Sequence, residues 1–156
     1  MTFAIKLTHD EPRLVYLALV YHLGRPGSEL DLATKRPSEH GLGMVEAALA
    51  NEPDAREATI ELDGEQFRKL LSAIYGCVNE LRVYHLRDGA GSTVPRFADV
   101  ARSLFPSIAA DAASALDVSE AMMMLHRRME RAVARAAEAA AEARPKRRSL
   151  RWPFRR

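Results

Sequence analysis

The stretch from Thr59 to Leu86 limits the fold of this chain most strongly, because it reads as a short strand followed by a capped amphipathic helix. Ile60 and Leu62 alternate with polar residues, which is the two-residue period of a half-buried strand. Asp63 offers a carboxylate to the free amides of a first helical turn, and Gln66 lies where its side chain can reach back to the cap. The helix that follows has one apolar stripe, made by Phe67, Leu70, Leu71, Ile74, Val78 and Leu81.

The N-terminus repeats this design 55 residues earlier. The matched pairs are Ile5 and Ile60, Lys6 and Glu61, Leu7 and Leu62, Thr8 and Asp63, and Glu11 and Gln66. We expect two matched units whose strands, residues 3–7 and 58–62, pair and whose helices lie on one face of the sheet. If the strands run parallel in this register, Lys6 and Glu61 become neighbours. The alternative is that any two strand-to-helix junctions share these features.

Periodicity and capping residues divide the rest of the chain into helices and loops. The first helix is predicted over residues 9–24 with Thr8 as its cap, and its apolar run from Leu14 to Tyr21 should be buried on most sides. Residues 25–40 hold two prolines and many polar residues, which favours a long surface loop. Further helices are expected from about Ser38 to Ala50, from the Asp63 cap to about Arg87, from Pro95 to Leu104, and from Ser107 onward, with Ser114, Asp117 or Ser119 as local caps.

The last helix carries a heptad seam. Its positions, spaced alternately by four and three residues, are Val118, Met122, Leu125, Met129, Ala132, Ala136, Ala139 and Ala143. Such a seam indicates packing against another helix. Two partners are open: the seam docks on the protein's own domain, or it forms a coiled-coil-like contact with a second copy. In the second case Val118, Met122, Leu125 and Met129 are the oligomer seam.

These elements predict an α+β fold that is predominantly α-helical, with two short strands that each lead into a capped helix and a long alanine-rich C-terminal helix. We expect residues 1–143 to form one compact domain and residues 144–156 to form a basic, disordered tail. Cys77 is the single cysteine, so a disulfide scaffold is excluded and a reducing, cytoplasmic location is the natural expectation. The sequence shows no pattern of a secretion signal or transmembrane segment.

Charge is distributed unevenly along the chain. All 21 acidic residues lie at or before Glu142, whereas seven of the 23 basic residues follow it. Residues 1–143 therefore hold 16 basic against 21 acidic residues, a net charge of −5, which does not suit a body that wraps nucleic acid.

The tail combines its cations with two aromatic residues, a composition that suits an anionic partner such as a membrane, a nucleic acid or an acidic protein. The residues predicted to make this contact are Lys146, Arg147, Arg148, Arg151, Trp152, Phe154, Arg155 and Arg156. The alternative is a solvated tail without a specific partner.

Residues that carry catalytic chemistry form no specific motif. The histidines lack a metal-ligand spacing, so neither a metal nor another cofactor is predicted. His22 and His85 lie in matching Tyr-His-Leu tripeptides, and with Asp88 they form the one candidate acid/base or metal site. Helix-end histidines favoured by the helix dipole are the simpler explanation. Cys77 lies close to an apolar stripe and is expected to be a core residue.

The sequence favours a non-enzymatic accessory or adaptor protein that acts through protein–protein contacts, with the basic tail for an anionic partner. The protein partner is either another protein or a second copy of this chain. One alternative is a nucleic-acid-associated regulator that binds phosphates through the tail. The other is a small enzyme that uses His22, His85 and Asp88.

Overall fold

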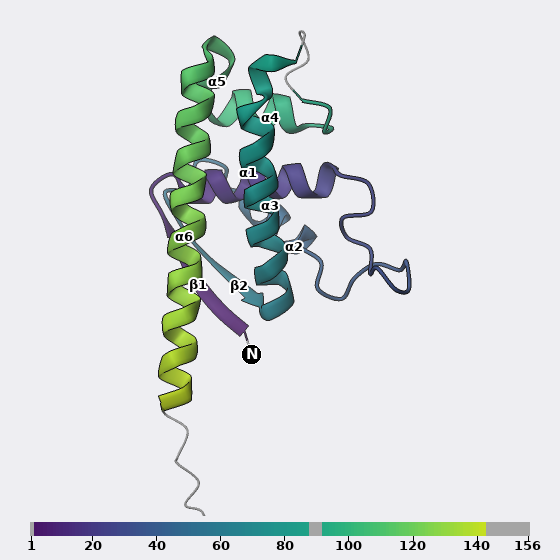
Figure 1. Cartoon of the computed structure of the whole chain (residues 1–156), viewed down its shortest axis with the longest axis vertical. Coiled ribbons are helices and arrows are strands. Elements are labelled where there is room, and N and C mark those ends of the chain that lie inside the picture. The colour runs from purple at the N-terminus through teal and green to yellow at the C-terminus, as the bar shows by residue number, and fades with distance from the viewer. Residues whose placement is uncertain (1, 88–91, 143–156) are drawn as a thin grey trace, which may run out of the picture.

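The computed structural model describes residues 2–87 and 92–142. It shows a predominantly helical α+β fold with a two-stranded sheet, as predicted (Figure 1). The elements are β1 (Thr2–Thr8), α1 (Glu11–Gly24), α2 (Gly43–Ala50), β2 (Glu57–Asp63), α3 (Gly64–Arg82), the 3₁₀ turn η1 (Tyr84–Leu86), α4 (Phe97–Leu104), α5 (Ser107–Ala110) and α6 (Ala112–Glu142). The predicted tail lies outside the described residues.

The two predicted strands do pair, and they run antiparallel. Ile5 lies opposite Ile60, so the two residues that correspond in the 55-residue repeat are also direct neighbours across the ladder. Exchanging β1 for β2 therefore leaves the register unchanged, which is the property of a local two-fold axis between these isoleucines. Lys6 faces Thr59 and its ammonium lies 3.4 Å from the Glu57 carboxylate. The parallel arrangement that would place Lys6 beside Glu61 is wrong.

The two strand-to-helix junctions resemble each other only in part. Asp63 and Gln66 form the predicted capping box: the Asp63 carboxylate accepts the Gln66 amide at 2.9 Å, and Gln66 Oε1 accepts the Asp63 amide at 3.0 Å. At the first junction, Glu11 Oε2 accepts the Thr8 amide at 2.8 Å. However, α1 begins at Glu11 with Asp10 as its N-cap, so the predicted start at residue 9 and the Thr8 cap are wrong. His9 adopts φ 57°, and this left-handed residue separates the strand from the helix.

Helix α1 is the centre of the core. It packs against α2, α3, α4 and α6, and its middle residues from Leu14 to Val20 are all buried, as its apolar run predicted. Where α1 crosses α3, Gly76 faces Tyr21: a Cβ added to Gly76 would lie 2.5 Å from the Tyr21 ring. The large side chains that are fully buried in the domain come from every α-helix except α2 and from both strands, including Leu7, Leu17, Leu62, Ile74, Phe97, Ile108 and Met122.

Several predicted helix boundaries differ from the structure. The helix expected from Ser38 begins only at Gly43, because Ser38 and His40 lie in a loop held by Lys69, whose ammonium contacts the Ser38 hydroxyl and the His40 carbonyl. The last helix is capped by Asp111, which accepts the Ser114 amide at 2.7 Å, and not by Ser114, Asp117 or Ser119. In addition, α3 ends at Arg82 before η1, and α4 begins at Phe97. The helix predicted from Ser107 onward is interrupted at the extended residue Asp111, which separates α5 from α6.

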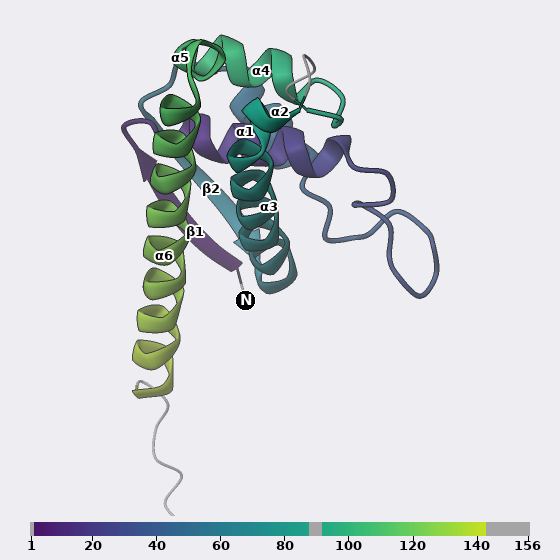
Figure 2. The same ribbon diagram turned by 45° about the horizontal axis from the view of Figure 1, so that its top comes forward.

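Helix α6 runs along one side of the molecule and extends past the rest of the fold (Figures 1 and 2). Its first two thirds pack mainly on α3 and α5, with a smaller contact to α1. Every residue in the segment 134–142 is exposed. This helix therefore offers two free surfaces: its outer side over the body, and the whole circumference of its projecting end.

Candidate functional site

The first half of the predicted seam lies in the core of the protein's own domain, whereas Ala136 and Ala139 of its alanine half are exposed. Met122, Leu125 and Met129 are buried, and Val118 is half-buried against the same core. Their burial accounts for the heptad spacing of this half without a second copy. If α6 binds a partner over the body of the domain, it does so through another side.

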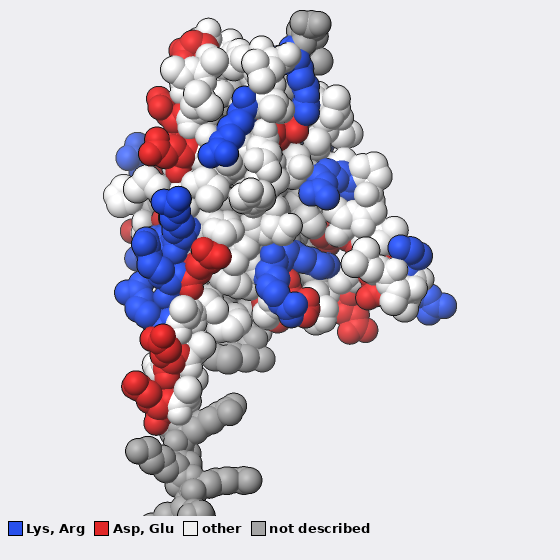
Figure 3. Space-filling view, in the orientation of Figure 1, with Lys and Arg blue, Asp and Glu red and all other residues white. Residues whose placement is uncertain are grey.

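The opposite side of α6 carries a second stripe with the same spacing. Its members are Asp117, Glu120, Met124, Arg127 and Arg131, which follow one another at intervals of three and four residues and are all exposed. We call these five residues the α6 outer face. None of its four charged residues forms an ion pair with another described residue. The basic cluster over the middle of α6 and the acidic residues beyond it are visible in Figure 3.

Met124 is the apolar centre of this face. Its side chain is 65% exposed, and Leu116, two turns away on the same helix, is 49% exposed. A large apolar residue that is exposed alone is ordinary, but here two lie on one helix beside charged residues that form no ion pair within the described part of the chain. This combination is typical of a surface that another molecule covers.

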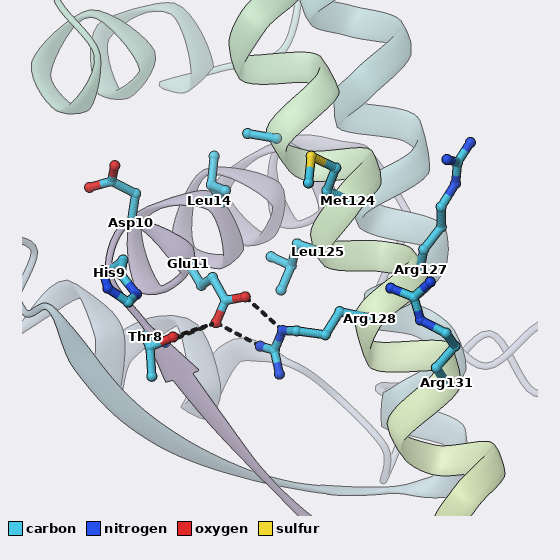
Figure 4. A pocket seen from close by; sticks show the side chains of 11 residues that line it. Thr8, His9, Asp10, Glu11, Leu14, Met124, Leu125, Arg127, Arg128 and Arg131 are labelled. Carbon is cyan, nitrogen blue, oxygen red and sulfur yellow. Dashed lines mark hydrogen bonds and ion pairs between the residues drawn. The ribbon is translucent and has the colours of Figure 1, made fainter.

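A groove of about 540 Å³ lies between the α6 outer face and the start of α1. Leu14, Met124 and Leu125 form its apolar lining, whereas Arg127 and Arg131 stand on the α6 side and Asp10 on the α1 side (Figure 4). A bound molecule could therefore place an acidic group beside the arginines and an apolar group against the apolar lining.

An ion pair between α6 and α1 lies in the wall of this groove. The Arg128 guanidinium donates two hydrogen bonds to the Glu11 carboxylate, from Nε to Oε1 at 2.7 Å and from Nη2 to Oε2 at 2.6 Å. Its Nη2 also donates to the Lys6 carbonyl at 3.3 Å. A bidentate arginine–carboxylate pair sets direction as well as distance. Because Glu11 also accepts the Thr8 amide, this contact holds α6 against the junction of β1 and α1.

A second hollow of about 390 Å³ continues along α6 on its α3 side. Arg82 of α3 borders it, together with Leu116, Glu120 and Met123 of α6. Met124 and Arg127 line both the groove and this second hollow. The groove and the hollow are therefore adjacent, with Met124 between them.

The predicted histidine pair does not come together as an acid/base site in the described residues. The His22 imidazole is buried and lies 2.6 Å from Glu29, whose other oxygen accepts the Leu42 amide at 2.7 Å. Burial lowers the pKa of His22, although the hydrogen bond to Glu29 acts in the opposite direction. His85 instead contacts the Ile108 carbonyl at 2.5 Å. Asp88 lies outside the described residues.

The loop over residues 25–42 is pinned to the domain at both ends. Glu29 bridges His22 and Leu42 near its start, and near its end His40 Nδ1 lies 2.7 Å from Asp63. Hydrogen bonds from the Gln66 amide and from His40 keep the pKa of Asp63 below its usual value. These contacts explain why so polar a segment has a defined path.

Cys77 is fully buried, and burial, followed by the nearby Glu80 charge, raises the pKa of its thiol well above the usual value. A thiol in this state is a poor nucleophile. Within residues 2–87 and 92–142, no three or more His, Cys, Asp or Glu side chains are grouped so as to hold a metal ion.

Sequence patterns did not reveal the groove. Arg128 and Glu11 are 117 residues apart, and although Glu11 stands out as the match of Gln66, nothing local links it to Arg128. The three- and four-residue spacing of the α6 outer face is visible in the sequence. It was overlooked because the seam on the opposite side of the same helix is more apolar and has the same spacing.

In the part of the chain that the structure describes, no helix is both long enough and apolar enough to cross a membrane. Comparison of the chain with protein families, with curated proteins and with solved structures finds no match.

Proposed function

We propose that this protein is an accessory or adaptor protein that acts through protein–protein contacts, with the α6 outer face as its docking surface. The observation that carries the proposal is the position of Met124, exposed between two hollows and flanked on the helix by charged residues without ion pairs among the described residues. A partner helix with apolar and charged residues at three- and four-residue spacing would fill the hollows and neutralise these charges.

The shape and charge of the surface favour a protein over a nucleic acid. Arg127, Arg128 and Arg131 alone would suit phosphates, but Asp117 and Glu120 lie on the same side of the helix within about four turns. These carboxylates would repel a continuous phosphate backbone. A protein segment can present acidic and basic residues at separate positions and match both.

The basic segment 144–156 supplies the second contact in this proposal. Its cations and its two aromatic residues support binding to an anionic partner, and we place the protein in the cytoplasm on the grounds of its single, reduced cysteine. The nucleic-acid-associated regulator remains the second candidate function, and the arginine cluster of α6 together with this segment is the observation that favours it.

Site-specific photo-crosslinking in the cell of origin tests the docking surface. A photoreactive residue replaces Met124 and, as a matched control, Met44, which is 84% exposed on α2. We expect a discrete protein adduct from position 124 that the additional substitution Arg131→Glu removes, and no such adduct from position 44. The proposal is wrong if position 124 gives no protein adduct, if Arg131→Glu leaves the adduct unchanged, or if the adduct is a nucleic acid.

A further inference from the structure

The order of charges on the α6 outer face is unusual for a single exposed helix. Asp117 and Glu120 precede Met124, and Arg127, Arg128 and Arg131 follow it, so like charges lie three or four residues apart on both sides. Like charges at this spacing destabilise a helix, whereas alternating charges would stabilise it. The helix dipole does not explain the order, because its effect fades beyond the terminal turns and the acidic Glu138 and Glu142 lie at the C-terminal end.

The same order is self-complementary when two such helices run antiparallel. Asp117 and Arg131 each lie seven residues from Met124, and Glu120 and Arg128 each lie four residues from it. If two helices cross with Met124 opposite Met124, each Asp117 therefore faces Arg131 of the other helix. Each Glu120 faces Arg128 of the other helix, which is also bound to Glu11, and Arg127 is the next residue along that helix.

We propose that the partner of the α6 outer face is a second copy of this chain, bound antiparallel with the crossing at Met124. This inference rests on the proposed function, that the α6 outer face docks a protein. The contact covers the exposed Met124 and brings opposite charges near the four charged residues of the face, which form no ion pair within the described part of the chain. A parallel pair would instead place Asp117 against Asp117 and Arg131 against Arg131, which charge repulsion disfavours.

The fold leaves room for this contact. The body of the domain packs on the side of α6 that carries Met122, Leu125 and Met129, opposite the outer face. In Figures 1 and 2 no other element covers the free side of α6. Two domains can therefore lie on the outside of a central pair of helices. The overlap runs from Ala113 to Arg135, about 11 residues on either side of Met124, or about three helical turns each way.

A charge-exchange experiment tests the pairing. Sedimentation velocity over a concentration series is measured for the wild-type chain, for the variant Asp117→Lys/Glu120→Lys, and for the variant Arg127→Glu/Arg131→Glu. We expect the wild type to dimerise, each variant alone to associate at least about tenfold more weakly, and an equimolar mixture of the two variants to recover the association. Circular dichroism on each variant checks that the fold is retained.

The variant Glu138→Lys/Glu142→Lys is the control, because it changes charges on the same helix but outside the overlap. It should dimerise like the wild type. The inference is overturned if the wild type is monomeric throughout, if the mixture does not recover association, or if this control loses it. If the wild type is monomeric but position 124 crosslinks to a different protein, the proposal that the partner is a second copy is wrong. The proposal that the α6 outer face docks a protein is then retained.

Discussion

At the scale of single residues, the fold depends on a few polar contacts between distant parts of the chain. Arg128 joins α6 to Glu11 at the start of α1, and Glu29 joins His22 to the amide of Leu42. Each of these groups is at least partly withdrawn from water, so its partner must be present to offset the lost hydration. Residue chemistry thus fixes where the helices and the 25–42 loop meet.

His22 makes the stability of the protein depend on pH. Burial lowers the pKa of its imidazole from the ordinary value of 6.5, so the unfolded chain binds a proton more readily than the folded protein does. The free energy of unfolding must then fall as the pH drops below this ordinary value. We expect denaturant titrations to show a decrease between about pH 7 and about pH 5.5, and a smaller decrease for His22→Gln. Equal decreases for both proteins would contradict the assignment to His22.

The rate at which Cys77 is modified by a thiol reagent measures how accessible the core is. The raised pKa of its buried thiol keeps it protonated and out of reach of reagents. We expect a thiol-specific chromophoric reagent to modify the native protein only at the rate of unfolding, and to react at once in denaturant. Rapid modification of the native protein would show that the α3 core is open.

At the scale of elements, local sequence patterns predicted the individual helices and strands better than the tertiary contacts between them. The alternation at Ile60 and Leu62 and the Asp63 cap define β2 and α3 because these signals involve neighbouring residues. The direction of β1 against β2 was not predictable, since the matched residues pair equally well either way until the connecting helices are placed. The groove was missed for the same reason, because Leu14 and Met124 meet only in the folded chain.

The crossing of α1 and α3 depends on a glycine. In most helices Gly→Ala is stabilising, but a Cβ at Gly76 would meet the Tyr21 ring at 2.5 Å. We expect Gly76→Ala to destabilise the protein by roughly 1–3 kcal/mol in chemical denaturation. Gly64, at the start of the same helix, has no atom within 4 Å of the added Cβ and serves as the control. A Gly76→Ala variant as stable as Gly64→Ala would show that α1 and α3 are not in close contact.

At the scale of the whole molecule, we propose that one folded domain carries two contact surfaces. The α6 outer face is proposed to bind a protein, and the basic segment 144–156 is proposed to bind an anionic partner. The two surfaces differ in what they require: the first needs the tertiary structure that places Met124 between its hollows, whereas the second is defined by composition alone.

Deletion of residues 144–156 separates these contributions. We expect the truncated chain to keep its melting temperature and its dimerisation, because the core residues all precede the deletion. Binding to anionic vesicles or to labelled nucleic acid should be lost, and in the full chain it should weaken as salt is added. Titrating each ligand against the full chain, with the truncated chain as the control, identifies which anion the segment prefers. If the truncated chain still binds both ligands as well as the full chain does, the segment is not the anion-binding site.

Distances between spin labels test the proposed antiparallel pairing of two α6 helices. Labels are attached through cysteines at Ala121 or at Glu138, and the buried Cys77 is replaced by alanine. In the antiparallel pair, the two copies of position 121 lie about six residues apart along the helices, or about 9 Å, and the two copies of position 138 about 28 residues apart, or about 42 Å. We predict a short distance from position 121 and a long one from position 138. Short distances from both positions, or no dipolar coupling at either, would contradict antiparallel pairing through the α6 outer face.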